Sequence, residues 1–223
     1  AFQVNEATAR ALGLGSVPGI GQHIRPYLNG RDFASRPRGR WVIDFFGLES
    51  EDVRARFPAA YQHLLERAKP ERDQNRNVIF RRLWWVIGHP RPQFRKATHG
   101  LRRFIVTVET AKHRAFGFLP AGVVPDSTLV TLAIEDALHL GVLSSEAHAA
   151  WAWANGGSMG VYIGNVRYNK TRCFETFPLP DDDTGLTPEL AKRIRSLAEQ
   201  IDAHRKAQQA AHADLTLTGM YNV

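Results

Sequence analysis

The sequence mixes two hydrophobic periodicities without a regular order, and this irregular order is what most constrains the fold. Short apolar runs bounded by Gly and Pro are typical of strands, whereas apolar residues spaced three or four positions apart are typical of helices. Because regular βαβ alternation is absent, the pattern predicts an α+β domain with a mixed sheet and flanking helices. The predicted strands cover residues 41–46, 102–109, 113–120 and 127–134, with a final pair over 159–168 and around Cys173.

The predicted helices carry their own start and stop signals. Residues 49–67 have helical spacing, and Pro58 is expected to divide them in two because proline breaks a helix interior. Residues 135–154 form a helical region that is broken once, with Ser144-Ser145-Glu146 as the predicted start of its second part and a glycine pair at its end. Before Asn29 the pattern predicts a short helix, a Gly/Pro loop and a second short helix.

Two prolines, Pro178 and Pro180, mark the exit from the compact part of the chain, because proline cannot continue a central strand. The pattern over residues 187–211 then predicts a long polar helix, and Thr187-Pro188-Glu189 is its expected start because proline is favoured at the first helical position. Its narrow apolar stripe consists of Leu190, Ile194, Leu197 and Ile201. The expected organisation is an N-terminal helical lead-in over 1–28, a compact domain over 29–180 and a C-terminal helical segment over 181–223.

Several function classes are disfavoured by composition. The 223 residues contain no apolar run near the roughly 18 needed to span a bilayer, and the first residues do not resemble a signal peptide. A single cysteine, Cys173, excludes an intramolecular disulfide framework and a cysteine zinc cluster, and the nine histidines are scattered. We therefore expect a cytoplasmic protein with no catalytic residues, no metal and no cofactor in this chain. Because it begins without Met, we also expect a fragment of a longer protein.

Positive charge is concentrated in one stretch. The net charge is +7, and residues 66–103 hold eleven Lys and Arg against three acids. Such a concentration favours a polyanionic partner, most often nucleic acid, although a solvated face without a partner is the alternative. Trp84 and Trp85 lie in this stretch, and adjacent bulky aromatics in an apolar window are expected to pack inward. The candidate phosphate ligands are Arg81, Arg82, Arg91, Arg95, Lys96, Lys112, Arg114, Asn169, Lys170 and Arg172.

A second donor-rich stretch covers residues 163–172. It contains Asn165 and Arg167, and Asn and Arg are the side chains best matched to bidentate pairing with adenine and guanine in the major groove. The neighbouring polar residues can hold phosphates. The stretch is therefore a candidate base-reading loop.

Taken in order, six segments resemble the target recognition region of the MmeI-like DNA adenine methyltransferases, which are often fused restriction–modification proteins (type IIG/IIL). Because several matches occur in the same order, the resemblance is more specific than any one of them. The segments are NGRDFASRPRGRWVIDFFG, ERAKPERDQNR, FRRLWWVIGHPRPQFRKA, RRFIVTVETAKHRAFGFL, GVLSSEAHAAWAWANGG and VRYNKTRCFETFPLP.

The resemblance implies a module that recognises double-stranded DNA inside a larger prokaryotic adenine-N6 methyltransferase. The family's S-adenosylmethionine-binding glycines and its Asn-Pro-Pro-Tyr/Phe motif do not occur here, so methyl transfer and the cofactor are implied to belong to a covalently linked domain upstream. Base-reading positions carried over by motif are Glu109, Ser127, Thr128, Ile163, Asn165 and Arg167. Two alternatives remain: a protein-interaction module that docks through the 187–211 helix, and an enzyme with an unrecognised site.

Overall fold

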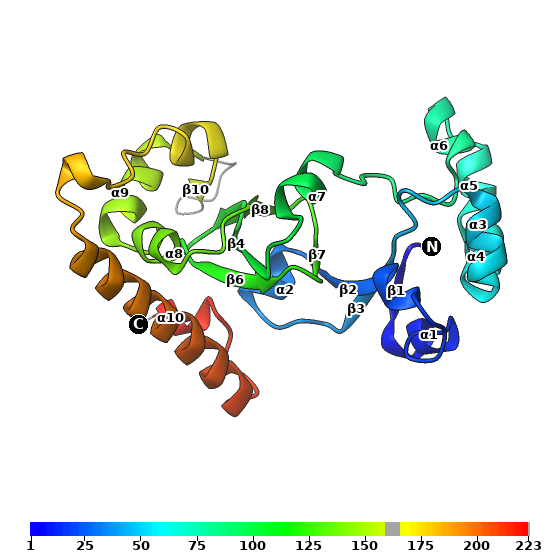
Figure 1. Ribbon diagram of the computed structural model, residues 1–223, viewed down its shortest axis with the longest axis horizontal. Helices are drawn as coiled ribbons and strands as arrows, with labels where there is room; N and C mark the ends of the chain where they lie inside the picture. The colour runs from blue at the N-terminus through cyan, green and yellow to red at the C-terminus, as the bar shows by residue number, and fades with distance from the viewer. Residues whose placement is uncertain (159–165, 223) are drawn as a thin grey trace. The chain divides into compact units, whose positions relative to one another are not determined.

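A computed structural model of the protein describes residues 1–158 and 166–222 (Figure 1). Strands and helices are intermixed, which confirms the predicted α+β class. The predicted functional boundaries at residues 28 and 180 stay a prediction. By its internal contacts the chain forms two compact units, the first with residues 1–27, 38–96 and 122–124 and the second with residues 28–37, 97–121 and 125–223.

The first unit contains a four-stranded sheet in the order β1-β3-β2-β7. Its elements are β1 (Gln3–Asn5), α1 (Glu6–Ala11), η1 (Ile20–Gln22), β2 (Ile24–Leu28), β3 (Arg40–Ile43) and β7 (Val124–Pro125). β3 lies in the predicted 41–46 strand, but β2 stands where the pattern predicts a second short helix. Ile24 pairs with Ile43 in an antiparallel ladder, and this long-range pairing overrides the local signal.

The first two helices after β3 confirm the predicted pair over residues 49–67, whereas the two short helices that follow them were not predicted. Their bounds are α3 (Ser50–Arg56), α4 (Pro58–Arg67), α5 (Lys69–Asp73) and α6 (Val78–Arg82). Pro58 opens α4 at its first position, as predicted. Trp84 and Trp85 are buried in the same core as Phe45, Phe57 and Leu64, which confirms that the tryptophan pair packs inward.

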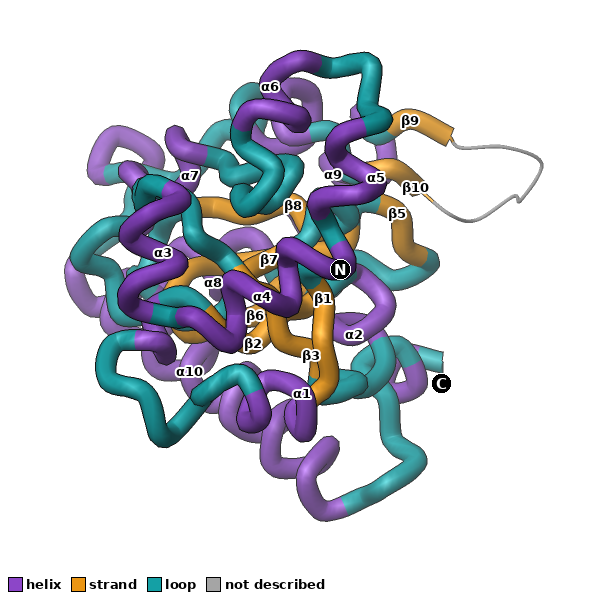
Figure 2. The backbone as a smooth tube through the Cα atoms, turned by 90° about the vertical axis from the view of Figure 1, so that its right-hand side faces the viewer, coloured by secondary structure: helices purple, strands orange, loops and turns teal. Residues whose placement is uncertain are grey.

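The second unit contains two three-stranded sheets. One has the order β6-β4-β8 and the other β5-β10-β9, and Figure 2 shows β5, β9 and β10 lying side by side. The strands are β4 (Arg103–Val108), β5 (Thr110–Ala111), β6 (Phe116–Pro120), β8 (Leu129–Leu132), β9 (Gly157–Ser158) and β10 (Val166–Arg167). Three of them, β4, β6 and β8, confirm the strands predicted over 102–134.

Three helices of the second unit, over residues 137–143, 146–155 and 188–211, follow their sequence signals, and Ser145 caps the second of them within the predicted Ser144-Ser145-Glu146 start. The bounds are α2 (Gly30–Ala34), α8 (Ala137–Leu143), α9 (Glu146–Asn155), η2 (Lys170–Phe174), η3 (Asp182–Thr184), α10 (Pro188–Ala211) and η4 (Gly219–Tyr221), while α7 (Pro92–Thr98) spans the boundary with the first unit. The predicted strand around Cys173 is wrong: the segment is the helical turn η2, because the Asn169 side chain caps it by accepting from Thr171 N.

Helix α10 packs against α8 through its small residues instead of its predicted apolar stripe. Ala191 and Ala198 are buried, whereas Leu190, Leu197 and Ile201 are 46%, 49% and 41% exposed. The approach is close, since a Cβ on Gly141 would lie 2.5 Å from a methyl of Ile194. Of the stripe, only Ile194 therefore lies at this contact, and the other three residues face solvent within the described chain.

Candidate nucleic-acid interface

Three segments of the second unit meet around the backbone of Glu109. Its N–H donates to the carbonyl of Thr128 (2.9 Å), and its own carbonyl accepts from the N–H of Tyr168 (2.7 Å). β10 runs antiparallel to β5, with Arg167 opposite Thr110. The structure therefore brings together three of the predicted base-reading residues, Glu109, Thr128 and Arg167, from positions far apart in the sequence.

The side chains of Arg167 and Glu109 form an ion pair at this meeting point. Nε and Nη2 of Arg167 both donate to Oε1 of Glu109, at 2.8 and 2.6 Å. The side chain of Arg167 is 50% exposed and that of Glu109 is 33% exposed. This oxygen accepts from the Nε–Nη2 side of the guanidinium. Nη1 has no hydrogen-bond partner within residues 1–158 and 166–222. The pair thus holds an arginine that still offers donors to solvent.

The neighbouring turn at 126–128 is braced from two sides. Thr128 N donates to Oδ1 of Asp126 (2.6 Å), and Oγ1 of Thr128 accepts from Gly30 N (2.7 Å). Gly30 must come close, because a Cβ there would lie 3.0 Å from Val108 and 3.2 Å from Thr128. The hydroxyl of Thr128 is therefore engaged by Gly30, although Thr128 and its neighbour Ser127 are both exposed residues.

Arg114 has a different place from the one that a phosphate ligand would take. Its guanidinium donates to the carbonyls of Val108 and Val166, the latter at 2.7 Å, and to Oγ1 of Thr107 at 3.2 Å. It also lies 5.0 Å from the centre of the Tyr168 ring. Burial lowers the pKa of Arg114 to about 10. With its donors directed at carbonyls, Arg114 ties β10 to the end of β4.

Below β10, a buried aromatic cluster supports the same strand. Tyr168 is 2% exposed, and its hydroxyl lies 2.9 Å from Nε2 of the fully buried His148, with which it shares a hydrogen bond. The ring of Phe177 lies edge-on to His148 at 4.5 Å. Burial is the main cause that lowers the pKa of His148 to about 4, with the charge of Arg114 second, and burial raises the pKa of Tyr168. His148 is therefore neutral at physiological pH.

The remaining candidates of the second unit lie around η2 and the β5–β6 connection. Lys170 and Arg172 are exposed, whereas Asn169 spends its side-chain oxygen on capping η2. Lys112 is exposed and donates to Oδ1 of Asn222 (2.9 Å). Ile163 and Asn165 lie outside the described residues.

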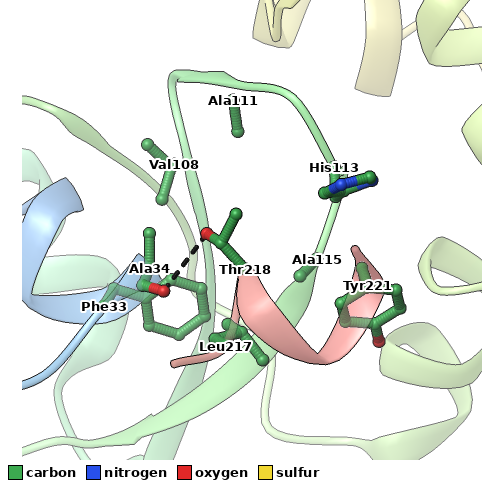
Figure 3. Close-up of a pocket in the computed structure, with 9 residues that line it drawn as sticks. All are labelled: Phe33, Ala34, Val108, Ala111, His113, Ala115, Leu217, Thr218 and Tyr221. Atoms are coloured by element: carbon green, nitrogen blue, oxygen red, sulfur yellow. Dashed lines mark hydrogen bonds between the residues drawn. The ribbon is translucent and has the colours of Figure 1, made fainter. Parts of the chain in front are cut away.

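A small pocket lies within the second unit, where residues of β4, β5 and α2 face the C-terminal segment (Figure 3). Its volume is about 10 Å³, enough for about one water molecule and too small for a ligand. Thr218 Oγ1 donates to the carbonyl of Ala34 (3.2 Å), and the Tyr221 ring stacks on His113. The C-terminal residues thus pack against α2 and the β5–β6 connection.

The five phosphate candidates of the first unit differ in their exposure and in the partners that their side chains have. Arg82 and Lys96 are exposed, and Arg81 donates to the carbonyl of Asn75 at 2.6 Å. Arg91 has a positive φ of 51°. The side chain of Arg95 forms an ion pair with Asp44.

The pairing of Arg95 is a feature that the sequence analysis missed. Nη2 of Arg95 lies 2.6 Å from Oδ2 of Asp44, and Nη2 of Arg25 lies 2.7 Å from the same oxygen. The side chain of Asp44 is 1% exposed. The available signal was the single acid inside the apolar run WVIDFF, since a buried carboxylate requires cationic partners.

Other chemistry finds no support in the described part of the chain. Among residues 1–158 and 166–222 no group of three His, Cys, Asp or Glu side chains is placed to hold a metal ion. No helix in these ranges is long and apolar enough to cross a membrane. Cys173 is a free, buried thiol next to the Ala152 carbonyl.

The fold is α+β, and it displays the half-exposed Arg167, paired with Glu109, at the end of strand β10. Residues 5–181 match the family "MmeI, target recognition domain", and the chain belongs to this family. No curated protein matches the chain. A solved structure of the Type IIL restriction–modification enzyme MmeI in complex with DNA is similar in fold, with a TM-score of 0.69 and 17% identity. The match covers 99% of this chain and 28% of that one, so the chain spans about a quarter of its length.

Proposed function

We propose that the chain reads base sequence in duplex DNA for a larger restriction–modification enzyme, and that Arg167 is a base-reading group. Family membership supports this proposal, as does the likeness to a chain that was solved in complex with DNA. The ion pair between Arg167 and Glu109 is the observation that carries it, because it joins two base-reading candidates and leaves guanidinium donors available.

The chemistry of the pair suits guanine. The major-groove edge of guanine offers two acceptors, O6 and N7, which match two parallel N–H donors of arginine. Glu109 holds the Nε edge of Arg167, so the Nη1–Nη2 edge points away from the carboxylate and is the edge presented to the base. A side chain held in one geometry loses less entropy on binding and discriminates better.

Phosphate contacts have a separate role in the proposal. Exposed cations near the reading strand, Lys170 and Arg172, hold the backbone and set the register of the loop. In the first unit, Arg82 and Lys96 add sequence-independent attraction. In the second reading turn Ser127 and Thr128 are both exposed, and the hydroxyl of Thr128 already accepts a hydrogen bond from Gly30.

The parent enzyme is proposed to be an S-adenosylmethionine-dependent adenine-N6 methyltransferase that acts in the cytoplasm. In that enzyme the cofactor and the catalytic motif belong to a covalently linked domain, and this chain contributes specificity alone. The resemblance of its segments to the recognition region of such enzymes supports this view.

The test is the set of sites methylated by the parent enzyme with Arg167→Ala. If Arg167 reads guanine, the change relaxes one base position and costs about 1–3 kcal/mol there. An unchanged recognition sequence with uniformly lower activity would assign Arg167 to phosphate. Arg172→Ala is the matched control, because it removes an exposed arginine nearby and should lower activity on all sequences equally.

A second role is suggested by α10. Leu190, Leu197 and Ile201 are exposed along one side of this helix, which favours a docking contact with another protein domain. Salt separates the two functions, because phosphate contacts weaken steeply with added salt whereas an apolar helix interface does not.

A further inference from the structure

Helix α6 presents large apolar side chains to solvent. Val78 and Ile79 are each 62% exposed, and Leu83, which follows the helix, is 38% exposed. Ile79 and Leu83 lie one turn apart, with Leu83 N donating to the Ile79 carbonyl at 2.8 Å, so they share a face. Aliphatic side chains gathered on one exposed surface indicate a contact site.

The exposed tip stands on a rigid support. Oδ1 of Asn77 caps the helix by accepting from Ile79 N (2.9 Å), and Arg81 donates to the carbonyl of Asn75 (2.6 Å). Just beyond the helix, Trp85 is buried in the core and its indole N–H donates to a backbone carbonyl at 2.9 Å. The apolar tip is therefore preorganised, and binding need not order it first.

The charge of the segment that carries the tip is mainly positive. Residues 74–96, which belong to the same compact unit, contain six Lys and Arg and no Asp or Glu, although Glu71 and Asp73 of the neighbouring α5 are acidic. Arg76 precedes Val78 and Ile79, Arg82 lies between Ile79 and Leu83, and both arginines are exposed. This charge complements a polyanion, and an apolar tip between arginines has the composition with which proteins wedge a side chain between DNA base steps.

We propose that Val78, Ile79 and Leu83 form an apolar wedge that enters the minor groove of duplex DNA and partly unstacks a base step. Arg76 and Arg82 hold the flanking phosphates. The inference rests on the proposed function as a DNA reader. It adds a contact that senses how easily the DNA deforms, since the cost of unstacking depends on the base step.

The test uses this chain and a short duplex of random sequence that carries 2-aminopurine, whose fluorescence rises when its base unstacks. The double variant Val78→Thr/Ile79→Gln keeps size and removes the apolar surface. We expect it to lose about tenfold in affinity and to lose the fluorescence rise, with an unchanged salt slope. Arg82→Gln is expected to lower the salt slope by about one and to keep the fluorescence rise.

Leu197→Gln is the matched control, because Leu197 is 49% exposed on α10 and should not affect either signal. Wild-type affinity and fluorescence in the double variant would overturn the wedge and leave the reading function intact. If the unmodified chain does not bind duplex DNA at low salt, the proposed reading function is wrong, and the wedge is wrong with it. Binding to phosphatidylserine vesicles is measured in parallel. If the double variant loses vesicle binding but keeps DNA binding, the apolar residues contact a membrane and the wedge is wrong. Val78→Thr alone replaces the double variant if the latter does not fold.

Discussion

Arg167 donates twice to one oxygen of Glu109, a residue 58 positions earlier in the chain. The pair is half exposed, so its own contribution to folding is small, about 0.2–1 kcal/mol. Its larger consequence is geometric, because it fixes which edge of the guanidinium faces outward.

Glu109→Gln is therefore expected to separate affinity from specificity. The change removes a negative charge from the proposed reading surface, so binding to random duplex should strengthen slightly. It also loosens Arg167, so discrimination at the base read by Arg167 falls, by less than the about 1–3 kcal/mol expected for Arg167→Ala. Competition binding of matched and single-mismatch duplexes to the parent enzyme measures both. Stronger discrimination in the variant would contradict the bracing role.

Arg114→Gln is expected to act on stability and not on salt dependence. Losing a buried guanidinium that serves two carbonyls and a hydroxyl should cost about 2–3 kcal/mol in the free energy of unfolding. Urea unfolding measures that cost. The matched control is Lys112→Gln, two residues earlier and exposed, which should keep stability and lower the salt slope of DNA binding by about one. Equal salt slopes for Lys112→Gln and the unmodified chain would remove Lys112 from the phosphate contacts.

The buried His148 predicts a loss of stability in mild acid. Its pKa is about 4 in the folded chain and about 6.5 when unfolded, so between these values the unfolded state binds the extra proton. Stability is complete above pH 6.5 and falls as pH drops toward 4, by up to about 3 kcal/mol. Urea unfolding at pH 7.5 and 4.5 checks this. His23 also has a pKa lowered by burial, so the comparison is with His148→Gln, in which the pH dependence should shrink. An unchanged pH dependence in that variant would contradict the prediction.

Binding of the chain to random duplex should be weak and salt-dependent, with a dissociation constant of about 10⁻⁴–10⁻⁶ M at physiological salt. The neighbours Arg95 and Lys96 offer an internal comparison. Lys96→Gln should lower the salt slope by about one and leave stability unchanged, because Lys96 is exposed. Arg95→Gln should destabilise the chain, because it leaves the buried Asp44 with one fewer cation. Binding that is unaffected by salt would contradict the phosphate assignment as a whole.

Local signals in the sequence were enough for the longer helices and for several strands. Pro58 at the start of α4, Ser145 as the cap of α9 and Thr187 before α10 act within one turn, so their effects can be predicted from neighbouring residues alone. The family could be predicted too, because it is carried by short segments in a fixed order. Where pairing partners are distant, local signals failed, as in β2, which is a strand because β3 lies beside it.

The site divides in the same way. Residue type pointed to Arg167 as a group suited to bases, and the family resemblance pointed to Glu109, but only the tertiary structure decided that the two side chains touch. It also decided that Arg114 serves buried carbonyls while Lys112 stays exposed, although both are cations two residues apart. The outward face of α10 was likewise decided by packing, since Gly141 admits small residues closely and leaves Leu197 and Ile201 in solvent. The physical reason is common to all three cases. Charge and hydrophobicity belong to a residue, whereas burial and partnership depend on what the rest of the chain places beside it.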